Sequence, residues 1–171
     1  PLPPADRERL DRVLALRRTE EGKAFFDRIG LRWDALRESC FGPTFHLEAL
    51  LRLLPADWVV ADLGTGTGFL LPVLARHFRR VIGVDSSEAM RDLARRRIAD
   101  EGLGNVDLRA GFLEALPLAD GEADLAVALL MLHHLADIPA ALREVARSLK
   151  PGGRLLVVEI PPHTNEAFRV A

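Results

Sequence analysis

The sequence predicts a single three-layer α/β domain core, in which helices cover both faces of a mostly parallel sheet. From residue 58 onward, short apolar runs alternate with stretches of helical periodicity. Strands that alternate with helices of about ten to fifteen residues are typical of βαβ units, whose strands are parallel. One apolar run leads into a glycine-rich loop, and the next one ends in a carboxylate. These two features predict a ligand site at the carboxyl ends of the strands.

Helical patterns precede the core and predict a separate segment over residues 1–55. The stretch 1–18 is rich in alternating charges, with apolar residues at helical spacing. A second helix is expected over about 22–38, and a third over about 44–54 after a break at Cys40-Phe41-Gly42-Pro43. We therefore expect an N-terminal helical cap over 1–55 and an α/β core over 56–171.

The expected elements of the core follow in order. Strands are expected over 58–63, 81–84, 106–110, 125–130 and 154–160, and helices over 69–78, 88–100 and 138–149. Ser86 or Ser87 can cap the helix over 88–100. The apolar face expected for that helix consists of Ala89, Met90, Leu93, Ala94, Arg97 and Ile98. The helix over 138–149 should stop at Lys-Pro-Gly-Gly, because proline and glycine end helices.

The composition of the chain argues against several classes of binding partner. The chain carries 23 basic and 25 acidic residues, interleaved along the predicted helices, with a net charge of −2. The basic clusters at 17–18, 79–80 and 95–97 each have acids nearby, and we interpret them as solvated helix faces rather than a nucleic-acid contact. No apolar run approaches a membrane span and no signal peptide is recognisable. Cys40 stands alone, without disulfide or zinc spacing, so we expect a soluble, cytoplasmic protein.

The glycine loop follows the first strand of the core. After Asp62, glycines stand at alternate positions, Gly64, Gly66 and Gly68. Glycine is required where the backbone turns with positive φ or where a ligand approaches the main chain closely. The dinucleotide-binding pattern G-x-G-x-x-G would require its third glycine at position 69, which is Phe69, whereas the third glycine here is Gly68. The loop therefore does not match that pattern. A phosphate-binding loop with Gly-Lys-Ser/Thr is excluded as well, because no such triplet follows.

The second strand ends in Asp85, 21 positions after Gly64. Two ribose hydroxyls present a pair of donors, and one carboxylate can accept both. An alternative role for Asp85 is to cap the helix over 87–100. Asp62, for its part, can tie down the glycine loop by hydrogen bonds to the backbone, and this role is compatible with a role in binding.

At this point a family resemblance is plain. The run VVADLGTGTGFL over 59–70 resembles the first motif of class I S-adenosylmethionine-dependent methyltransferases, of the type 11, UbiE-like group, and 105–159 resembles the third to fifth motif regions. The resemblance implies a Rossmann-like fold, S-adenosylmethionine as cofactor, and SN2 methyl transfer to a small-molecule acceptor. It also implies a cofactor site made of Asp62, Gly64, Thr65, Gly66, Gly68, Asp85, Ser86, Met90, Gly111, Phe112, Leu113, Leu129, Phe26 and Trp33.

The sequence departs from the family pattern in two places. Many relatives have Gly-Asp after strand three, where this chain has Gly111-Phe112, so the side-chain acceptor for the adenine amino group is absent. Phe112 and Leu113 are expected to sandwich the adenine instead, and Glu114 is a weaker substitute. The family also adds a helix and an antiparallel strand pair after strand five. Because only residues 161–171 remain, we expect a fragment, or an edge covered by another chain such as a homodimer partner.

The N-terminal residues 12–37 resemble the linker of fusions that join an arsenical-resistance-type winged-helix repressor to a methyltransferase domain. In such proteins this segment lies over the cofactor, and Phe26 and Trp33, seven residues apart, can close the pocket or simply pack on the sheet. Arsenite methylation is rejected, because that chemistry relies on several thiols and this chain has only Cys40.

His133 and His134 follow the end of the fourth strand and are the candidates for a general base. Adjacent residues point in different directions, so at most one should face the substrate, and a structural histidine is the alternative for each. His163 is a weaker candidate, and no metal-ligand spacing is present. A non-catalytic S-adenosylmethionine-binding sensor is the second hypothesis. An NAD-dependent oxidoreductase is the third, and the early Gly68 argues against it.

Overall fold

The computed structural model describes residues 3–17 and 30–159 of the chain. The chain separates into two units, residues 1–46 and 47–171. The first holds α1 (Pro4–Arg17), the 3₁₀ helix η1 (Gly30–Arg32) and α3 (Trp33–Phe41), and α4 (Phe45–Leu51) follows at the boundary. The helix expected over 22–38 lies partly outside the described residues. Its described part continues to Phe41, three residues beyond the predicted end, and stops at Gly42, whose φ is +80°.

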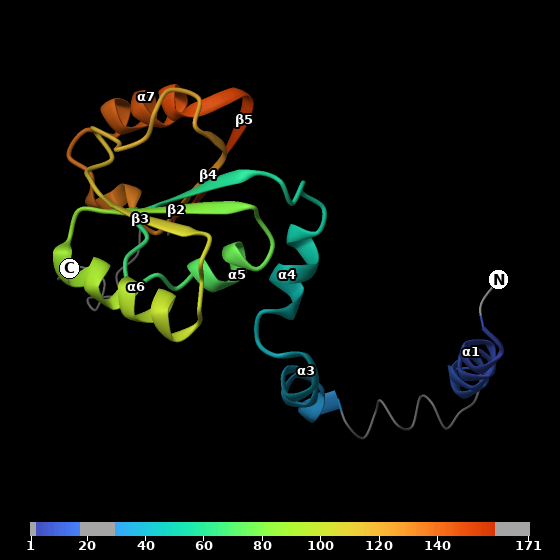
Figure 1. Ribbon diagram of the computed structural model, residues 1–171. Coiled ribbons are helices and arrows are strands. Elements are labelled where there is room, and N and C mark those ends of the chain that lie inside the picture. Colours follow the sequence, from blue (N-terminus) through green and yellow to red (C-terminus); the bar gives the residue numbers. More distant parts are fainter. Residues whose placement is uncertain (1–2, 18–29, 160–171) are drawn as a thin grey trace. The chain divides into compact units, whose positions relative to one another are not determined.

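The second unit carries a five-stranded, all-parallel sheet with the strand order β3-β2-β1-β4-β5 (Figure 1). The strands are β1 (Val59–Leu63), β2 (Arg80–Asp85), β3 (Val106–Ala110), β4 (Ala123–Leu129) and β5 (Leu149–Val158). The helices are α5 (Leu71–Ala75), α6 (Glu88–Asp100), η2 (Leu132–His134) and α7 (Ile138–Ser148). This arrangement confirms the predicted α/β class.

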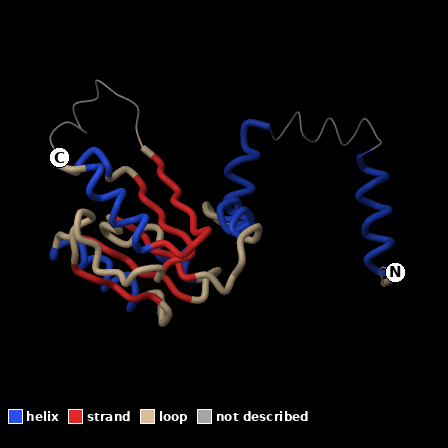
Figure 2. The backbone as a smooth tube through the Cα atoms, turned by 90° about the horizontal axis from the view of Figure 1, so that it is seen from above, coloured by secondary structure: helices blue, strands red, loops and turns tan. Residues whose placement is uncertain are grey.

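The sheet separates two hydrophobic cores. Alternate side chains of a strand point to opposite faces, and all five residues of β1 are buried. Val59, Ala61 and Leu63 pack on the face that α7 covers. Val60 packs on the other face, with side chains of α5 and α6. Helices lie on both sides of the sheet (Figures 1 and 2). Burial on both faces explains why β1 is apolar at every position except Asp62, rather than alternating between apolar and polar residues.

The buried face of α6 differs from the predicted one. Ser87, not Ser86, is the N-cap, and its hydroxyl accepts the N–H of Met90. The buried residues of the helix are Arg91 and Ala94, whereas Met90 and Leu93 are exposed. Periodicity placed both on one helix face with Ala94, and the family resemblance placed Met90 in the cofactor site; each lines one of the two clefts described below.

The last strand begins earlier than predicted. β5 starts at Leu149, directly after α7, and ends at Val158, whereas a strand over 154–160 was expected. The Lys-Pro-Gly-Gly segment therefore belongs to the strand, where the pairing with β4 shifts register. Gly152 has a φ of +80°, which suits a glycine at such an irregularity. Lys150 also binds Asp124 of β4 at 2.7 Å, and this ion pair holds the irregular part of β5 on the sheet.

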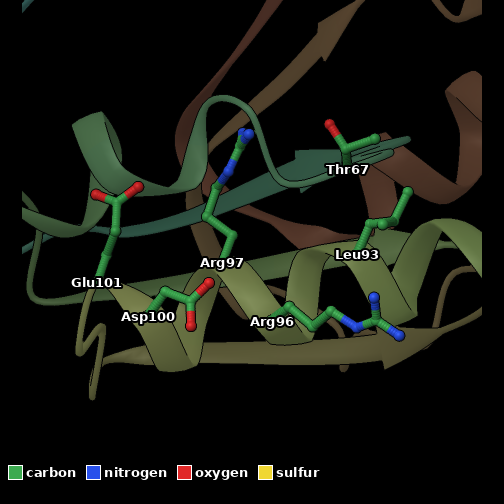
Figure 3. A pocket seen from close by; sticks show the side chains of 6 residues that line it. All are labelled: Thr67, Leu93, Arg96, Arg97, Asp100 and Glu101. Carbon is green, nitrogen blue, oxygen red and sulfur yellow. The ribbon is translucent and has the colours of Figure 1, made fainter.

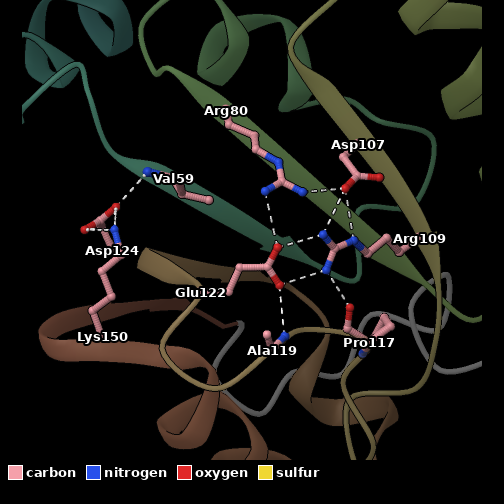
Figure 4. Close-up of polar contacts among 9 residues, drawn as sticks. All are labelled: Val59, Arg80, Asp107, Arg109, Pro117, Ala119, Glu122, Asp124 and Lys150. Atoms are coloured by element: carbon pink, nitrogen blue, oxygen red, sulfur yellow. Dashed lines mark hydrogen bonds and ion pairs between the residues drawn. The ribbon is translucent and has the colours of Figure 1, made fainter.

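A network of charged side chains joins β2 and β3 to the start of β4 (Figure 4). Arg109 of β3 donates to both oxygens of Glu122, at 2.7 and 2.9 Å, and to the carbonyl of Pro117. Arg80 of β2 lies 3.3 Å from Glu122 and binds Asp107. The hydrogen bonds from Arg109 hold the pKa of Glu122 below its usual range. β3 and β4 are not neighbours in the sheet, so Glu122 links parts of it that share no backbone pairing.

We expect Glu122→Gln to lower the free energy of unfolding by about 1–3 kcal/mol at pH 7, because the substitution removes hydrogen bonds to a charged group. A carboxylate with a lowered pKa stabilises above its unfolded pKa and loses this effect as the pH falls. The difference between wild type and variant should therefore shrink below about pH 4. Urea unfolding at pH 7 and below about pH 4 measures this difference in the free energy of unfolding. Asp100→Asn, an exposed substitution on α6, serves as the control, and an equal loss in both variants would contradict the prediction.

Candidate active site

A pocket of about 500 Å³ opens at the carboxyl ends of β1, β2 and β4. Its volume falls in the range of small-molecule sites. Predicted site residues that line it are Gly64, Gly66, Asp85, Ser86, Met90, Gly111, Phe112, Leu113, Leu129 and His134. The remaining lining residues are Glu114, Leu130, Met131, Leu135 and Ala136. No arginine or lysine stands among these described lining residues, which carry two carboxyl groups.

The three glycines of the loop have different structural roles. Gly64 has a φ of +71°, and a Cβ there would come 3.1 Å from Met131. Gly66 has a φ of +53° but faces open space, because nothing lies closer than 4.0 Å to a Cβ at this position. Gly68 has a φ of +73° and packs against Leu71 and Ala94, away from the pocket. Gly66 therefore leaves the main chain open to a ligand, while Gly68 allows the loop to pack closely on the helices.

Asp85 holds the glycine loop and the start of α6 together. Its Oδ2 accepts the N–H of Gly66 at 2.8 Å, and its Oδ1 accepts the N–H of Ser87 at 2.8 Å. Each carboxylate oxygen can accept a further bond, and the half-buried side chain lines the pocket. The carboxylate is thus fixed by two backbone donors and can still receive a ligand's hydroxyls. The helix cap itself is Ser87.

Asp62 lies beneath the loop rather than in the pocket. Its side chain is 4% exposed, and its Oδ2 accepts the hydroxyl of Thr65 at 2.5 Å. Burial raises the pKa of Asp62 to about 6, against the opposing effect of the Thr65 hydrogen bond and with a smaller contribution from the charge of Asp85. Asp62 ties down the loop, as one of the two sequence hypotheses stated, but through a side chain instead of the backbone. Thr65 does not line the pocket either.

Asp62→Asn should change the pH dependence of stability. The raised pKa means that the folded state keeps a proton that the unfolded chain releases above about pH 4. This stabilisation is fully present below the unfolded pKa and is lost as the pH rises through about 6. We therefore expect the unfolding free energy of the wild type, relative to the variant, to fall by about 3 kcal/mol between pH 4 and pH 7. Urea titrations at intermediate pH values test this, and a constant difference would contradict it.

The other half of the pocket is built by the chain after β4. Leu130 has a φ of +53°, the one left-handed non-glycine residue among those described, and its N–H donates to Val158 of β5 at 2.8 Å. Met131 is buried against Gly64. In η2 the two histidines diverge: His134 lines the pocket, whereas Nδ1 of His133 lies 2.8 Å from Oε1 of Glu159. Of the two histidines, His134 alone is a lining residue of the pocket.

Glu159 is the functional candidate that sequence reasoning missed. It directly follows β5 and also accepts the N–H of Leu132 at 3.0 Å. An acidic residue at the end of an apolar strand is the same signal that singled out Asp62 and Asp85, so the sequence offered a way to find it.

Some predicted residues are not placed. Phe26 and His163 lie outside the described residues, and Trp33 belongs to α3 but its side chain is not described. Within the described ranges, no group of three His, Cys, Asp or Glu residues can hold a metal ion. In the same ranges, no helix is long and apolar enough to cross a membrane.

A second cleft, of about 410 Å³, lies beside the glycine loop (Figure 3). Thr67 contributes from the loop, and the rest of the lining comes from α6 and the residue after it: Leu93, Arg96, Arg97, Asp100 and Glu101. Arg96 and Arg97 extend in different directions and share the cleft with two carboxylates. This mixture agrees with the interpretation of residues 95–97 as a solvated helix face.

Comparison with known proteins gives consistent matches. A family model described as "Methyltransferase domain" matches residues 61–157, more than half of the chain. The uncharacterized methyltransferase YcgJ of Bacillus subtilis is 35% identical over 104 residues, covering 61% of this chain and 41% of its own. A demethylmenaquinone methyltransferase of Thermus thermophilus is 37% identical over 149 residues, covering 84% and 67%. The crystal structure of YcgJ superposes with a TM-score of 0.63 at 29% identity, covering 71% of this chain and 54% of that one. The chain thus spans less than half the length of several curated relatives.

Proposed function

This chain belongs to the class I S-adenosylmethionine-dependent methyltransferases, and we propose that it transfers a methyl group from S-adenosylmethionine to a small-molecule acceptor by SN2 displacement. When bound, the cofactor supplies a methyl group already activated on a sulfonium. The observation that carries the proposal is the pairing of Asp85 with Gly66 at the mouth of the pocket. A fixed carboxylate beside an open, left-handed glycine suits a ligand that combines ribose hydroxyls with a polar tail.

We assign the residues around the pocket to parts of the cofactor. The second acceptor sites of the Asp85 oxygens would take the two ribose hydroxyls. The backbone at Gly64 and Gly66 would lie along the methionyl part. Phe112 and Leu113 would hold the adenine, and Met90 is a further lining residue of the pocket. The exposure of Phe112, 66%, fits a side chain that is covered only when a ligand is present.

The charge of the pocket favours a neutral acceptor. Asp85 and Glu114 line it without a described basic partner in the lining, so an anionic acceptor would meet repulsion while a cationic sulfonium would not. The far side is mainly apolar, with Leu130, Met131 and Leu135. The Thermus thermophilus relative acts, by its name, on demethylmenaquinone. An apolar aromatic acceptor with a hydroxyl group fits these surroundings.

Calorimetric titration of the chain with S-adenosylmethionine and S-adenosylhomocysteine tests the proposal, with NAD as the control. We expect micromolar binding of both and none of NAD. Turnover with a panel of phenols, quinols and amines then separates an enzyme from a non-catalytic sensor. NAD binding would revive the oxidoreductase hypothesis, and a folded protein that binds none of the three would refute the assignment.

Three finer proposals concern the surroundings of the core. We propose that residues 1–55 form a cap in which Phe26 and Trp33 close the pocket. We place the protein in the cytoplasm, in keeping with its single cysteine. The side chains of β5 from Leu155 to Val158 are 37–49% exposed, and we propose that a second chain, as in a homodimer, covers this edge. Light scattering measures the last of these directly.

A further inference from the structure

One carboxylate holds the turn that follows β4. Oε2 of Glu159 accepts the N–H of Leu132 at 3.0 Å, and Oε1 lies 2.8 Å from Nδ1 of His133. Leu132 opens η2, where a helical turn leaves its first N–H groups without internal partners. Glu159 therefore fixes η2 at its first residue through the backbone and at its second through a side chain.

The imidazole ring of His134 packs against the ring of His133. The ring centroids of His133 and His134 lie 4.0 Å apart, with the planes inclined by 49°. The N–H of His134 donates to the carbonyl of Met131 at 3.1 Å. The imidazole that lines the pocket is thus supported by a ring that Glu159 holds. Since a carboxylate can only accept, Nδ1 of His133 carries the hydrogen of this bond.

We propose that His134 takes the proton of the methyl acceptor and that Glu159 and His133 are its positioning residues; this rests on the proposed methyl transfer. The acceptor oxygen forms the bond to the methyl carbon while the carbon–sulfur bond breaks and leaves its electron pair on sulfur. The hydroxyl proton passes to the imidazole of His134 and from there to solvent. The arrangement follows the general pattern of a base oriented through neighbouring groups.

The other proton acceptors of the pocket are less suited to this task. Both oxygens of Asp85 are engaged by the N–H groups of Gly66 and Ser87, in the half of the pocket assigned to the cofactor. Glu114 follows β3, on the adenine side. His134 is the one described lining residue with an imidazole, and it stands among the apolar residues of the acceptor side.

Kinetics with 4-substituted phenols test the role. We expect His134→Gln to lower kcat about 100-fold and Glu159→Ala about tenfold, with the dissociation constant of S-adenosylhomocysteine nearly unchanged. Both losses should shrink with 4-nitrophenol, since an acidic phenol needs no base. Glu144→Ala is the matched control: that carboxylate also accepts a backbone N–H, from Leu116, but does not line the pocket.

Ring-¹⁵N NMR of the histidines decides the geometry even if none of the phenols is methylated. S-adenosylhomocysteine should shift the signals of His134, and Glu159→Ala should release His133 from its single tautomer and alter the response of His134. If the ring-¹⁵N signals of both histidines stayed unchanged in Glu159→Ala, or if S-adenosylhomocysteine did not shift the signals of His134, the positioning role alone would be overturned. A folded wild type that does not bind S-adenosylhomocysteine would overturn the proposed function with it.

Discussion

Asp85→Ala should weaken S-adenosylhomocysteine binding about 100-fold or more. Each hydrogen bond to a charged group contributes about 1.5–3 kcal/mol. The variant would lose the two proposed hydrogen bonds from the ribose hydroxyls, and their sum exceeds the roughly 2.7 kcal/mol that corresponds to a roughly 100-fold change in affinity. The variant also loses the acceptor that now fixes the N–H of Gly66. Calorimetry at equal salt measures the change, and circular dichroism shows whether the variant is folded.

Asp92→Asn provides the comparison for this result. Asp92 is exposed on α6 and pairs with Arg95, outside the pocket. Its substitution should leave the affinity within about threefold of the wild type. If Asp85→Ala also stayed within that margin, the ribose would be bound by other groups and the assignment of the pocket to the cofactor would fail.

Gly68→Ala should lower the free energy of unfolding by about 2–5 kcal/mol. A φ of +73° costs an alanine about 1–2 kcal/mol, and the added Cβ would lie 2.9 Å from Cδ1 of Leu71 and 3.2 Å from Cβ of Ala94. Such overpacking costs about 1–3 kcal/mol more. Urea unfolding monitored by circular dichroism gives the value.

The matched control is Gly102→Ala. Gly102 has a φ of +63° with nothing within 4 Å of the added Cβ, so it shows the cost of the backbone conformation alone, about 1–2 kcal/mol. Equal losses at Gly68 and Gly102 would mean that the loop shifts freely and that its contact with α6 is unimportant. A larger loss at Gly68 would show that the third glycine of the motif serves packing.

Elements with one clear local pattern were predicted at their observed bounds, as α6 and β3 show. β5 was not, because proline and two glycines at 151–153 read locally as a loop, while pairing with β4 and the Lys150–Asp124 ion pair extend the strand through them. Long-range contacts of this kind leave no trace in periodicity.

The site was predicted in its cofactor half more completely than in its acceptor half. Gly66 follows β1 and Asp85 ends β2, and each stands in a recognisable strand-end pattern; because the two strands pair in parallel, their carboxyl ends lie side by side. The contact of His133 with Glu159 joins residues 26 positions apart. His133 lies in η2 after β4, Glu159 directly follows β5, and the pairing of β4 with β5 brings these segments together. Met90, expected in the cofactor site from the family resemblance, lines the pocket, although periodicity alone places it on the same helix face as the buried Ala94.

The strand order β3-β2-β1-β4-β5 separates the residues assigned to the cofactor from those assigned to the acceptor according to their position in the chain. The groups assigned to the cofactor come mainly from the segment before β4, and Leu130, His134 and Glu159 come from the segment after it. Given the proposed methyl transfer, substitutions, insertions or exchanged segments beyond residue 129 can therefore alter which molecule is methylated while the cofactor half stays unchanged. Acceptor preference in such a scaffold can diverge quickly without a new cofactor site having to arise.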